Sequence, residues 1–307
     1  MPDMQIAGAS TPTCAPPLAH PSRPALVLPP GSCDAHFHIF GPGRRFPYAE
    51  GRPFTPPDAP KEALFALHRH LGFERGVIVQ TTAHGTDHAA LLDALEAGEG
   101  RYCGVGLLST TTTAEEIARL DSAGICGVRF HFVPKLGAAP TLDDVWTIVR
   151  LVQPFGWHVA IHVIGNALLS VVDFIRAIEL PVVIDHIART DVSEGADGPA
   201  FTALRRLVDT GKVWVKLSGT DRISKQDPPF RDAIELARVI ARQAPQRIVW
   251  GTDWPHPNAR VMPDEGQLVD AIGEIAPDPG MRHLMLVENP SKLFRFRRQE
   301  KRLQRSL

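Results

Sequence analysis

Short runs of apolar and β-branched residues recur eight times along the chain, with amphipathic segments between them. The runs are CDAHFH (33–38), GVIVQ (76–80), YCGVGLL (102–108), GVRFHF (127–132), HVAIHV (158–163), PVVIDH (181–186), VWVKLS (213–218) and IVWGTD (248–253). Several intervening segments, such as APKEALFALHRHLG (59–72), end in Gly or Pro, as helices commonly do. Apolar strands alternating with helices are typical of a buried parallel sheet. Eight such units predict an α/β fold, a (β/α)8 TIM barrel, over residues 31–297.

A chain of 307 residues has room for one such barrel or for two ordinary domains. The main alternative for alternating strands and helices is an open, doubly wound sheet. No G-x-G-x-x-G motif and no phosphate-binding P-loop follows any of the eight runs, so a nucleotide-binding sheet is not indicated. The sequence therefore favours a single catalytic barrel.

The charge balance argues against a nucleic-acid partner, because 33 Lys and Arg residues face 34 Asp and Glu residues. No apolar run approaches the roughly 20 residues that cross a bilayer, and the start of the chain lacks a signal-peptide pattern. The cysteines are scattered without a C-x-x-C pair, as in proteins of a reducing compartment: Cys14, Cys33, Cys103 and Cys126. We expect a cytoplasmic protein without a membrane partner.

The two ends of the chain differ from its middle in composition. Residues 1–30 are rich in proline and small residues, which predicts an extended arm laid across the barrel or across a partner subunit. If the arm contacts a partner subunit, the protein forms a homo-oligomer, and the sequence leaves both arrangements possible. Residues 298–307 are basic, and we expect a solvated tail there.

Polar residues gather where the predicted strands end, which is where the chemistry of such barrels takes place. His36 and His38 share one face of the first run because side chains alternate along a strand. His162 ends the fifth run, His186 the sixth and Asp253 the eighth. An isolated H-x-H is commonly a pair of structural histidines, but this distribution favours a functional site.

Four of these residues form a plausible mononuclear metal site: His36, His38, His162 and Asp253. Neutral imidazoles and a carboxylate suit zinc, with manganese as an alternative, and an open position would hold water. A bound metal lowers the pKa of that water to about 7, and Asp253 would accept its proton. His186 would orient the water or polarise a substrate carbonyl. A metal-free reaction stays open.

The chain resembles the amidohydrolase superfamily, in which H-x-H on the first strand, histidines on the fifth and sixth strands and an aspartate on the eighth form the site. More narrowly, it resembles the branch of 2-pyrone-4,6-dicarboxylate lactonases and 4-sulfomuconolactone hydrolases. The matching stretches are DAHFHIFGPGRRFPYAE, LGFERGVIVQTTAHG, GVRFHFV, GWHVAIHV, PVVIDHIAR, IVWGTDWPHPN and LMLVENPSKLF. They cover most of the chain between residues 32 and 296.

The resemblance implies hydrolysis of a small, unsaturated, anionic lactone in bacterial aromatic catabolism. It implies a catalytic core of His36, His38, His186 and Asp253, with Asp253 as general base. The positions that it assigns to substrate binding are Tyr48, Thr82, Arg129, Arg222 and Asn258. Guanidinium groups suit a dicarboxylate, because their fork matches the geometry of a carboxylate. An internal acid is the alternative partner for Arg129.

Two positions depart from the pattern of the metal-free lactonases in this branch. His162 stands where they have a tyrosine, which restores the superfamily's ligand set and favours a metal. Lys135 stands where they have an arginine, and its point charge suits a tetrahedral sulfonate at least as well as a carboxylate. Hydrolysis of 4-sulfomuconolactone is therefore a direct alternative.

Three further functions are less favoured by these residues. A sugar lactone carries hydroxyls, which the predicted cations suit less well than acids. A decarboxylase on the same scaffold would release carbon dioxide. A metal- or ligand-binding barrel without turnover would not need Asp253 together with His186.

Overall fold

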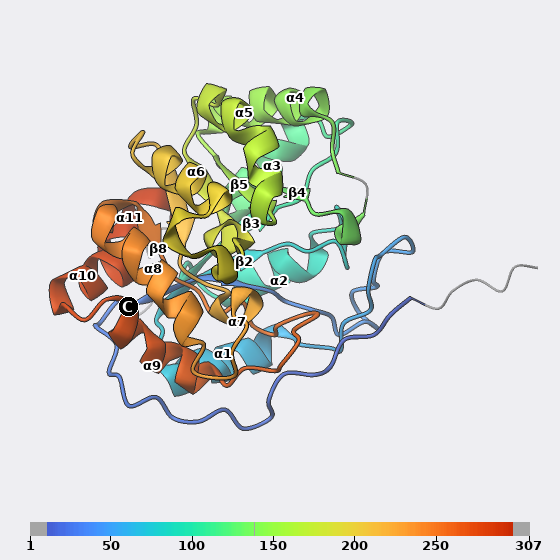
Figure 1. Cartoon of the computed structure of the whole chain (residues 1–307). Coiled ribbons are helices and arrows are strands. Elements are labelled where there is room, and N and C mark those ends of the chain that lie inside the picture. Colours follow the sequence, from blue (N-terminus) through green and yellow to red (C-terminus); the bar gives the residue numbers. More distant parts are fainter. Residues whose placement is uncertain (1–10, 138, 297–307) are drawn as a thin grey trace, which may run out of the picture.

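The computed structural model describes residues 11–137 and 139–296, and it confirms the eight-stranded barrel. All eight strands are parallel and pair in chain order. They are β1 (Cys33–Phe37), β2 (Arg75–Val79), β3 (Tyr102–Gly106), β4 (Ile125–Phe132), β5 (His158–Val163), β6 (Val182–Ile184), β7 (Val213–Lys216) and β8 (Ile248–Val249). Figure 1 shows the helices around this sheet. The expected basic tail at residues 298–307 lies outside the described residues.

Backbone hydrogen bonds between β1 and the segment after β8 bring the two edges of the sheet together. The amide of Ala35 donates to the carbonyl of Trp250 at 2.8 Å, and the amide of Asp253 donates to the carbonyl of His36 at 2.8 Å. The amide of His38 donates to the carbonyl of Trp254 at 2.8 Å. Closure of the barrel thus places the H-x-H residues directly beside Asp253.

The helices cover the outside of the barrel, and their ends carry local stop and start signals. Thr113 caps one helix, as its side chain accepts a hydrogen bond from the amide of Glu116, and Gly72 ends another in the left-handed conformation. The helices are α1 (Lys61–Leu71), α2 (Ala89–Ala97), α3 (Ala114–Ala123), α4 (Leu142–Val152), α5 (Val172–Ala177), α6 (Pro199–Val208), α7 (Thr220–Ile223), α8 (Arg231–Gln243), α9 (Glu265–Ile275), α10 (Pro279–His283) and α11 (Asn289–Leu293).

The core has an inner and an outer part, because strand residues alternate between the two faces of the sheet. Val77 and Val79 belong to the inner cluster, whereas Ile78 between them packs with the helices. Cys33, Cys103 and Cys126 are buried in the inner cluster. All four cysteines are free thiols, as their spacing predicts.

The sixth and eighth strands are shorter than predicted. The eighth ends at Val249, so Asp253 lies in the loop that follows it. The sixth ends at Ile184, and His186 lies in a short turn, Asp185–Arg189, that follows it. All four residues from His186 to Arg189 have positive φ, between 45° and 54°. None of them is a glycine, so nothing in the local composition signals this left-handed turn.

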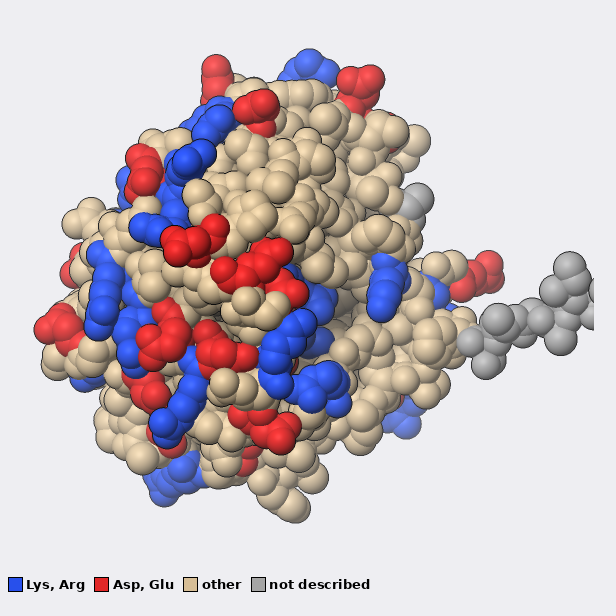
Figure 2. Space-filling view, viewed as in Figure 1, with Lys and Arg blue, Asp and Glu red and all other residues tan. Residues whose placement is uncertain are grey.

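The surface carries charges of both signs. On the face shown in Figure 2, Lys and Arg side chains are interspersed with Asp and Glu. Among the described residues, no helix combines the length and the apolar character that a membrane crossing requires.

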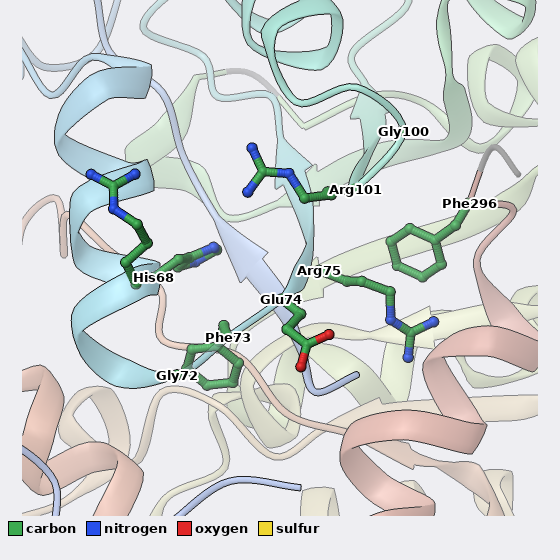
Figure 3. Close-up of a pocket in the computed structure, with 9 residues that line it drawn as sticks. His68, Gly72, Phe73, Glu74, Arg75, Gly100, Arg101 and Phe296 are labelled. Carbon is green, nitrogen blue, oxygen red and sulfur yellow. The ribbon is translucent and has the colours of Figure 1, made fainter. Parts of the chain in front are cut away.

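A hollow of about 750 Å³ lies at the amino ends of the strands. It is lined by residues that precede or begin β2 and β3, including Glu74, Arg75 and Arg101 (Figure 3). The Arg75 guanidinium donates to the carbonyls of Gly31 and Val287 and to the hydroxyl of Ser291. This hollow contains none of the predicted site residues and lies at the end of the barrel that normally serves stability.

Candidate active site

A second cavity, of about 680 Å³, lies at the carboxyl ends of the strands. The structure brings most of the predicted site residues into its lining: His38, Thr82, Arg129, Lys135, His162, His186, Arg222, Asp253 and Asn258. His36 is fully buried beside them. The cavity therefore joins the predicted catalytic and substrate-binding residues in one place.

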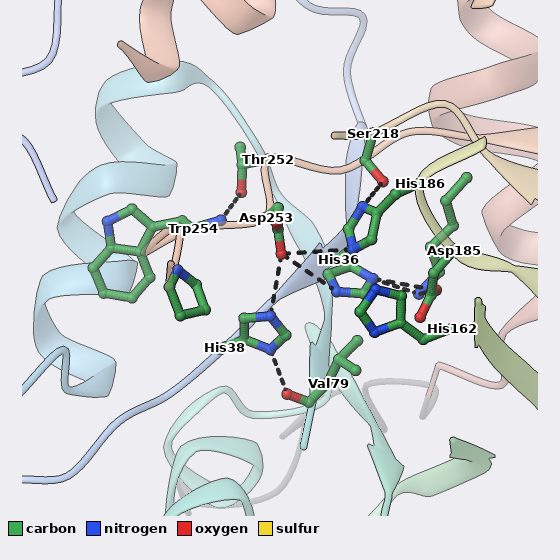
Figure 4. A network of polar contacts seen from close by, with 12 residues as sticks. His36, His38, Val79, His162, Asp185, His186, Ser218, Thr252, Asp253 and Trp254 are labelled. Carbon is green, nitrogen blue, oxygen red and sulfur yellow. Dashed lines mark hydrogen bonds and ion pairs between the residues drawn. The ribbon is translucent and has the colours of Figure 1, made fainter. Parts of the chain in front are cut away.

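Asp253 is the residue on which the imidazoles converge (Figure 4). Its Oδ1 lies 3.2 Å from His38 Nε2, 3.6 Å from His36 Nε2 and 3.8 Å from His186 Nε2. Its backbone has a φ of 64°, a conformation that non-glycine residues adopt at a cost of about 1–3 kcal/mol. Such strain is common at functional sites, and here it points the carboxylate at the three rings.

Arg222, at the end of α7, holds the other oxygen of this carboxylate. Its Nε and Nη2 donate to Asp253 Oδ2 at 2.8 and 2.6 Å, and its Nη1 donates to the carbonyl of Pro257 at 2.6 Å. Burial favours the neutral acid, but the positive charge of Arg222, together with the neighbouring histidines, outweighs it and holds the pKa of Asp253 well below its usual range. Asp253 is thus a carboxylate at neutral pH, with Oδ1 facing the histidines.

His38 has its proton assigned by its other contact. Its Nδ1 lies 2.7 Å from the carbonyl oxygen of Val79, which only accepts hydrogen bonds, so Nδ1 carries a proton. In the neutral ring, Nε2 then presents a lone pair to Asp253 Oδ1 at 3.2 Å. Two acceptors at this distance require a cation or a proton between them.

A buried group of four charged or titratable side chains lies beneath the cavity. Lys216 Nζ, on β7, lies 2.9 Å from His36 Nδ1 and 3.2 Å from Asp185 Oδ1. Arg129 Nε donates to Asp185 Oδ2 at 2.8 Å. Burial favours the neutral acid, yet Lys216 and Arg129 hold the pKa of Asp185 well below its usual range. Arg129 therefore has an internal acid as partner, which is the alternative that the sequence left open.

His186 is neutral in this environment. Burial disfavours its charged form and lowers its pKa to about 3, although Asp253 and Asp185 oppose the shift. Its Nδ1 contacts the hydroxyl of Ser218 at 2.9 Å, which fixes the ring so that Nε2 faces Asp253. A neutral, oriented imidazole can position water or a carbonyl oxygen without adding charge.

Groups of histidine and carboxylate atoms that could hold a metal ion are present among the described residues. His36, His38 and Asp253 form one group, and His36, Asp185 and His186 form another, with ligand atoms within 4.8 Å of one another. His162 belongs to neither. Its Nδ1 lies 3.2 Å from His131 Nδ1, and its Nε2 is buried without a hydrogen-bond partner among the described residues.

Tyr48 is the predicted substrate-binding residue that the structure places outside the cavity lining. Its hydroxyl donates to Asp58 Oδ1 at 2.9 Å, and its ring packs against His84. Lys135, by contrast, is exposed at the cavity and forms no ion pair with the described residues. It is free to meet an anion.

Two residues of this site, Arg189 and Lys216, are not among those predicted from the sequence. Arg189 lines the cavity and forms no ion pair with any residue in the described ranges, and its burial lowers its pKa. Lys216 is fully buried against His36. The stretch DHIART contains Arg189, but only the left-handed turn directs it to the cavity; Lys216 follows the inward alternation of β7, which a strand pattern can reveal.

Comparisons with known proteins agree with this geometry. A family model described as amidohydrolase matches residues 33–296. A 2-pyrone-4,6-dicarboxylate hydrolase from Comamonas testosteroni is 41% identical over 286 residues, which cover 90% of this chain and 94% of that protein. A 4-sulfomuconolactone hydrolase from Hydrogenophaga intermedia is 39% identical, with coverage of 92% and 95%. A D-galactarolactone isomerase from Agrobacterium fabrum is 34% identical, with coverage of 90% and 94%.

Proposed function

Because the chain belongs to the amidohydrolase family, we propose that its cavity hydrolyses a small lactone that carries two anionic groups. The hydrolases of 2-pyrone-4,6-dicarboxylate and 4-sulfomuconolactone among its relatives support this substrate class. The observation that carries the proposal is one ionised carboxylate, Asp253, facing three imidazoles in a cavity lined by cations. Ring opening of such a lactone is a step of aromatic catabolism.

Asp253 acts as the general base in this proposal. Arg222 occupies Oδ2, so Oδ1 is the oxygen that accepts a proton from the attacking water. His186 Nε2 lies close to the same oxygen and orients the water or the lactone carbonyl. Proton transfer by a positioned group of this kind contributes about 10²- to 10⁴-fold to a rate.

The cations of the cavity bind the anionic substituents, but they are not equivalent. Arg129 and Arg222 already pair with Asp185 and Asp253. Arg189 and Lys135 form no ion pair with the described residues, so they carry the uncompensated positive charge. We assign the two anionic groups of the substrate chiefly to Arg189 and Lys135, with Thr82 and Asn258 as polar partners.

The residues present fit one divalent metal ion. The lone pair of His38 Nε2 faces the carboxylate of Asp253, and His36 Nε2 is buried without a hydrogen-bond partner in the described part of the chain. Two imidazoles and a carboxylate suit zinc, which lowers the pKa of a bound water to about 7. We propose zinc, with manganese as the alternative. A proton on His38 Nε2 satisfies the same contact in a metal-free reaction.

Elemental analysis of the purified wild type and of His162→Ala tests the metal. One zinc per chain that is lost in the variant supports His162 as a further ligand. One zinc that persists in the variant limits the ligands to His36, His38 and Asp253. Hydrolysis that survives a chelator, without metal in either protein, contradicts the metal proposal.

Lys135 favours a second candidate substrate, 4-sulfomuconolactone, because a point charge serves a sulfonate well. Assays of both lactones with the wild type and with Lys135→Arg distinguish the two. If the sulfonate is the natural group, the wild type has the higher kcat/KM for 4-sulfomuconolactone, and the arginine variant moves the preference towards the dicarboxylate. No hydrolysis of either lactone contradicts the proposed function.

A further inference from the structure

Residues 11–30 of the predicted N-terminal arm lie against the barrel, and we call this segment the strap; residues 1–10 lie outside the described residues. In Figure 1 it is the dark blue segment along the lower edge of the molecule. Ser22 donates from its amide and its hydroxyl to the carboxylate of Asp264, which caps α9. The amide of Leu26 donates to Asp270 Oδ1 at 2.8 Å. The strap is therefore fixed along α9.

The strap ends at the mouth of the cavity. Its Thr13 pairs with Thr55 in a parallel bridge: the Cys14 amide donates to the Thr55 carbonyl at 3.0 Å, and the Thr55 amide donates to the Pro12 carbonyl at 2.8 Å. Pro12 belongs to the cavity lining together with Pro53 and Phe54. A segment more than 200 positions away from Asp253 in the chain thus forms part of the same wall.

Cys14 contacts a residue of the cavity directly. Its Sγ lies 3.3 Å from Asn258 Oδ1, with the thiol as donor. Burial raises the pKa of this thiol, so its proton is retained at neutral pH. Because the thiol engages Oδ1, the amide NH2 of Asn258, which supplies two donors, takes no part in this contact, and Asn258 itself lines the cavity. The backbone of Asn258 has a φ of 60°, a left-handed conformation that asparagine adopts more readily than most residues.

We propose that the strap forms one wall of the substrate cavity and that Cys14 is a positioning residue, whose thiol holds Asn258 with its NH2 group towards the substrate. The inference rests on the proposed function for the identity of the substrate, an anionic lactone whose oxygens accept hydrogen bonds. The contact between Cys14 and Asn258 itself is independent of that function.

Three variants test the role of the thiol: Cys14→Ala, Cys14→Ser and, as a control on an exposed neighbour, Ala15→Ser. Loss of one oriented hydrogen bond to substrate raises KM by about threefold to tenfold. We expect this increase in Cys14→Ala with kcat within about twofold of wild type. We expect Cys14→Ser, which keeps a hydrogen-bond donor, to have a KM close to that of the wild type. Ala15→Ser also has the wild-type KM.

A double-mutant cycle separates positioning from a general effect on the strap. In an Asn258→Ala background, Cys14→Ala has no further effect on KM if the thiol acts through Asn258. An unchanged KM in Cys14→Ala, an increase that Cys14→Ser fails to restore, or additive effects of the two alanine substitutions each overturn the proposal.

A measurement without substrate keeps the test independent of the proposed function. The chain has only three asparagines, Asn166, Asn258 and Asn289, so selective ¹⁵N-asparagine labelling gives three side-chain amide signal pairs. The Asn258 pair is assigned by its loss in Asn258→Asp. We expect the chemical shifts of this signal pair to change in Cys14→Ala and to stay near their wild-type values in Cys14→Ser. If no lactone is turned over, the proposed function fails, yet an unmoved Asn258 signal in Cys14→Ala is what overturns the Cys14 contact.

Discussion

Among single residues, Arg129 and Arg189, two of the three arginines that line the cavity, differ in what they stabilise. Arg129 neutralises Asp185 inside the protein, whereas Arg189 has no ion-pair partner among the described residues. An uncompensated, partly buried cation costs stability unless it serves a ligand. We therefore propose that Arg129 contributes to folding and Arg189 to binding.

We expect Arg189→Met to raise the KM for an anionic lactone by about 10- to 100-fold, because a charge-assisted hydrogen bond is lost, and to leave stability unchanged or higher. Arg129→Met is the matched comparison: it leaves Asp185 with one cation fewer and lowers stability by about 3 kcal/mol. Steady-state kinetics and urea denaturation of both variants measure the difference. Equal losses of stability in the two variants contradict this division of roles.

Lys216 connects the buried charges to the H-x-H residues. We expect Lys216→Met to lower the free energy of unfolding by about 3 kcal/mol, because Asp185 loses a buried cation that no water can replace. Lys225→Met, which removes a surface pair with Asp191, is the control and costs under about 1 kcal/mol. Urea denaturation midpoints of the two variants measure the difference. If both variants lose equally little stability, Lys216 does not stabilise the buried charges beneath the cavity.

At the scale of elements, the left-handed turn after β6 depends on a glycine of the next strand–helix unit. Gly219 has a φ of 72°, and a Cβ there lies 2.9 Å from the Cβ and Nδ1 atoms of His186. Gly211 has a similar φ of 77° but has open space around its Cα. Substitutions at the two glycines therefore distinguish the effect of backbone strain, which both share, from the effect of displacing His186, which only Gly219 has.

Alanine at either glycine costs about 1–2 kcal/mol of stability, since both backbones are left-handed. We expect Gly219→Ala alone to lower kcat, by at least about tenfold, because it pushes the imidazole away from Asp253. Assays of the two variants at a temperature where both remain folded provide the comparison. Equal kcat values mean that the position of His186 does not limit the reaction.

The elements also show what a sequence can and cannot reveal. The eight strands and the capped helix at Thr113 are predictable because strand alternation and caps are local signals. Histidines and Asp253 at strand ends are predictable because barrel topology fixes where those ends meet. The free charge of Arg189 is not predictable from the sequence, because it depends on a left-handed turn that contains no glycine. The contact of Cys14 with Asn258 is not predictable either, because the two residues lie far apart in the chain. The role of Tyr48 in substrate binding stays a prediction.

At the scale of the whole molecule, several buried imidazoles couple stability to pH. Burial lowers the pKa of His186 to about 3, and burial with nearby cations lowers those of His36, His131 and His162 well below the usual value. Their pKa in the unfolded chain is about 6.5. Below pH 6.5, the unfolded chain therefore binds protons that the folded protein does not, and stability falls as the pH is lowered towards 3.

We expect the free energy of unfolding to drop by at least about 2 kcal/mol between pH 7.5 and pH 5, since each such histidine contributes up to about 1.4 kcal/mol per pH unit. Asp185 and Asp253 add a further loss only below about pH 3.8, where the unfolded carboxylates become protonated. Urea denaturation at both pH values measures this decrease in the free energy of unfolding. We expect a smaller decrease in His131→Asn than in the wild type. A flat profile means that these histidines are not buried in the neutral form.

In the proposed reaction, this barrel adds water to an anionic lactone with Asp253 as the base. The most direct measurement is mass spectrometry of the products formed from 2-pyrone-4,6-dicarboxylate and 4-sulfomuconolactone in H₂¹⁸O, by the wild type and by Asp253→Asn. We expect an opened product that carries one ¹⁸O in the new carboxylate, formed at least about a hundredfold more slowly by the variant. A product of unchanged mass indicates isomerisation, and loss of carbon dioxide indicates decarboxylation; either result contradicts the proposed hydrolysis.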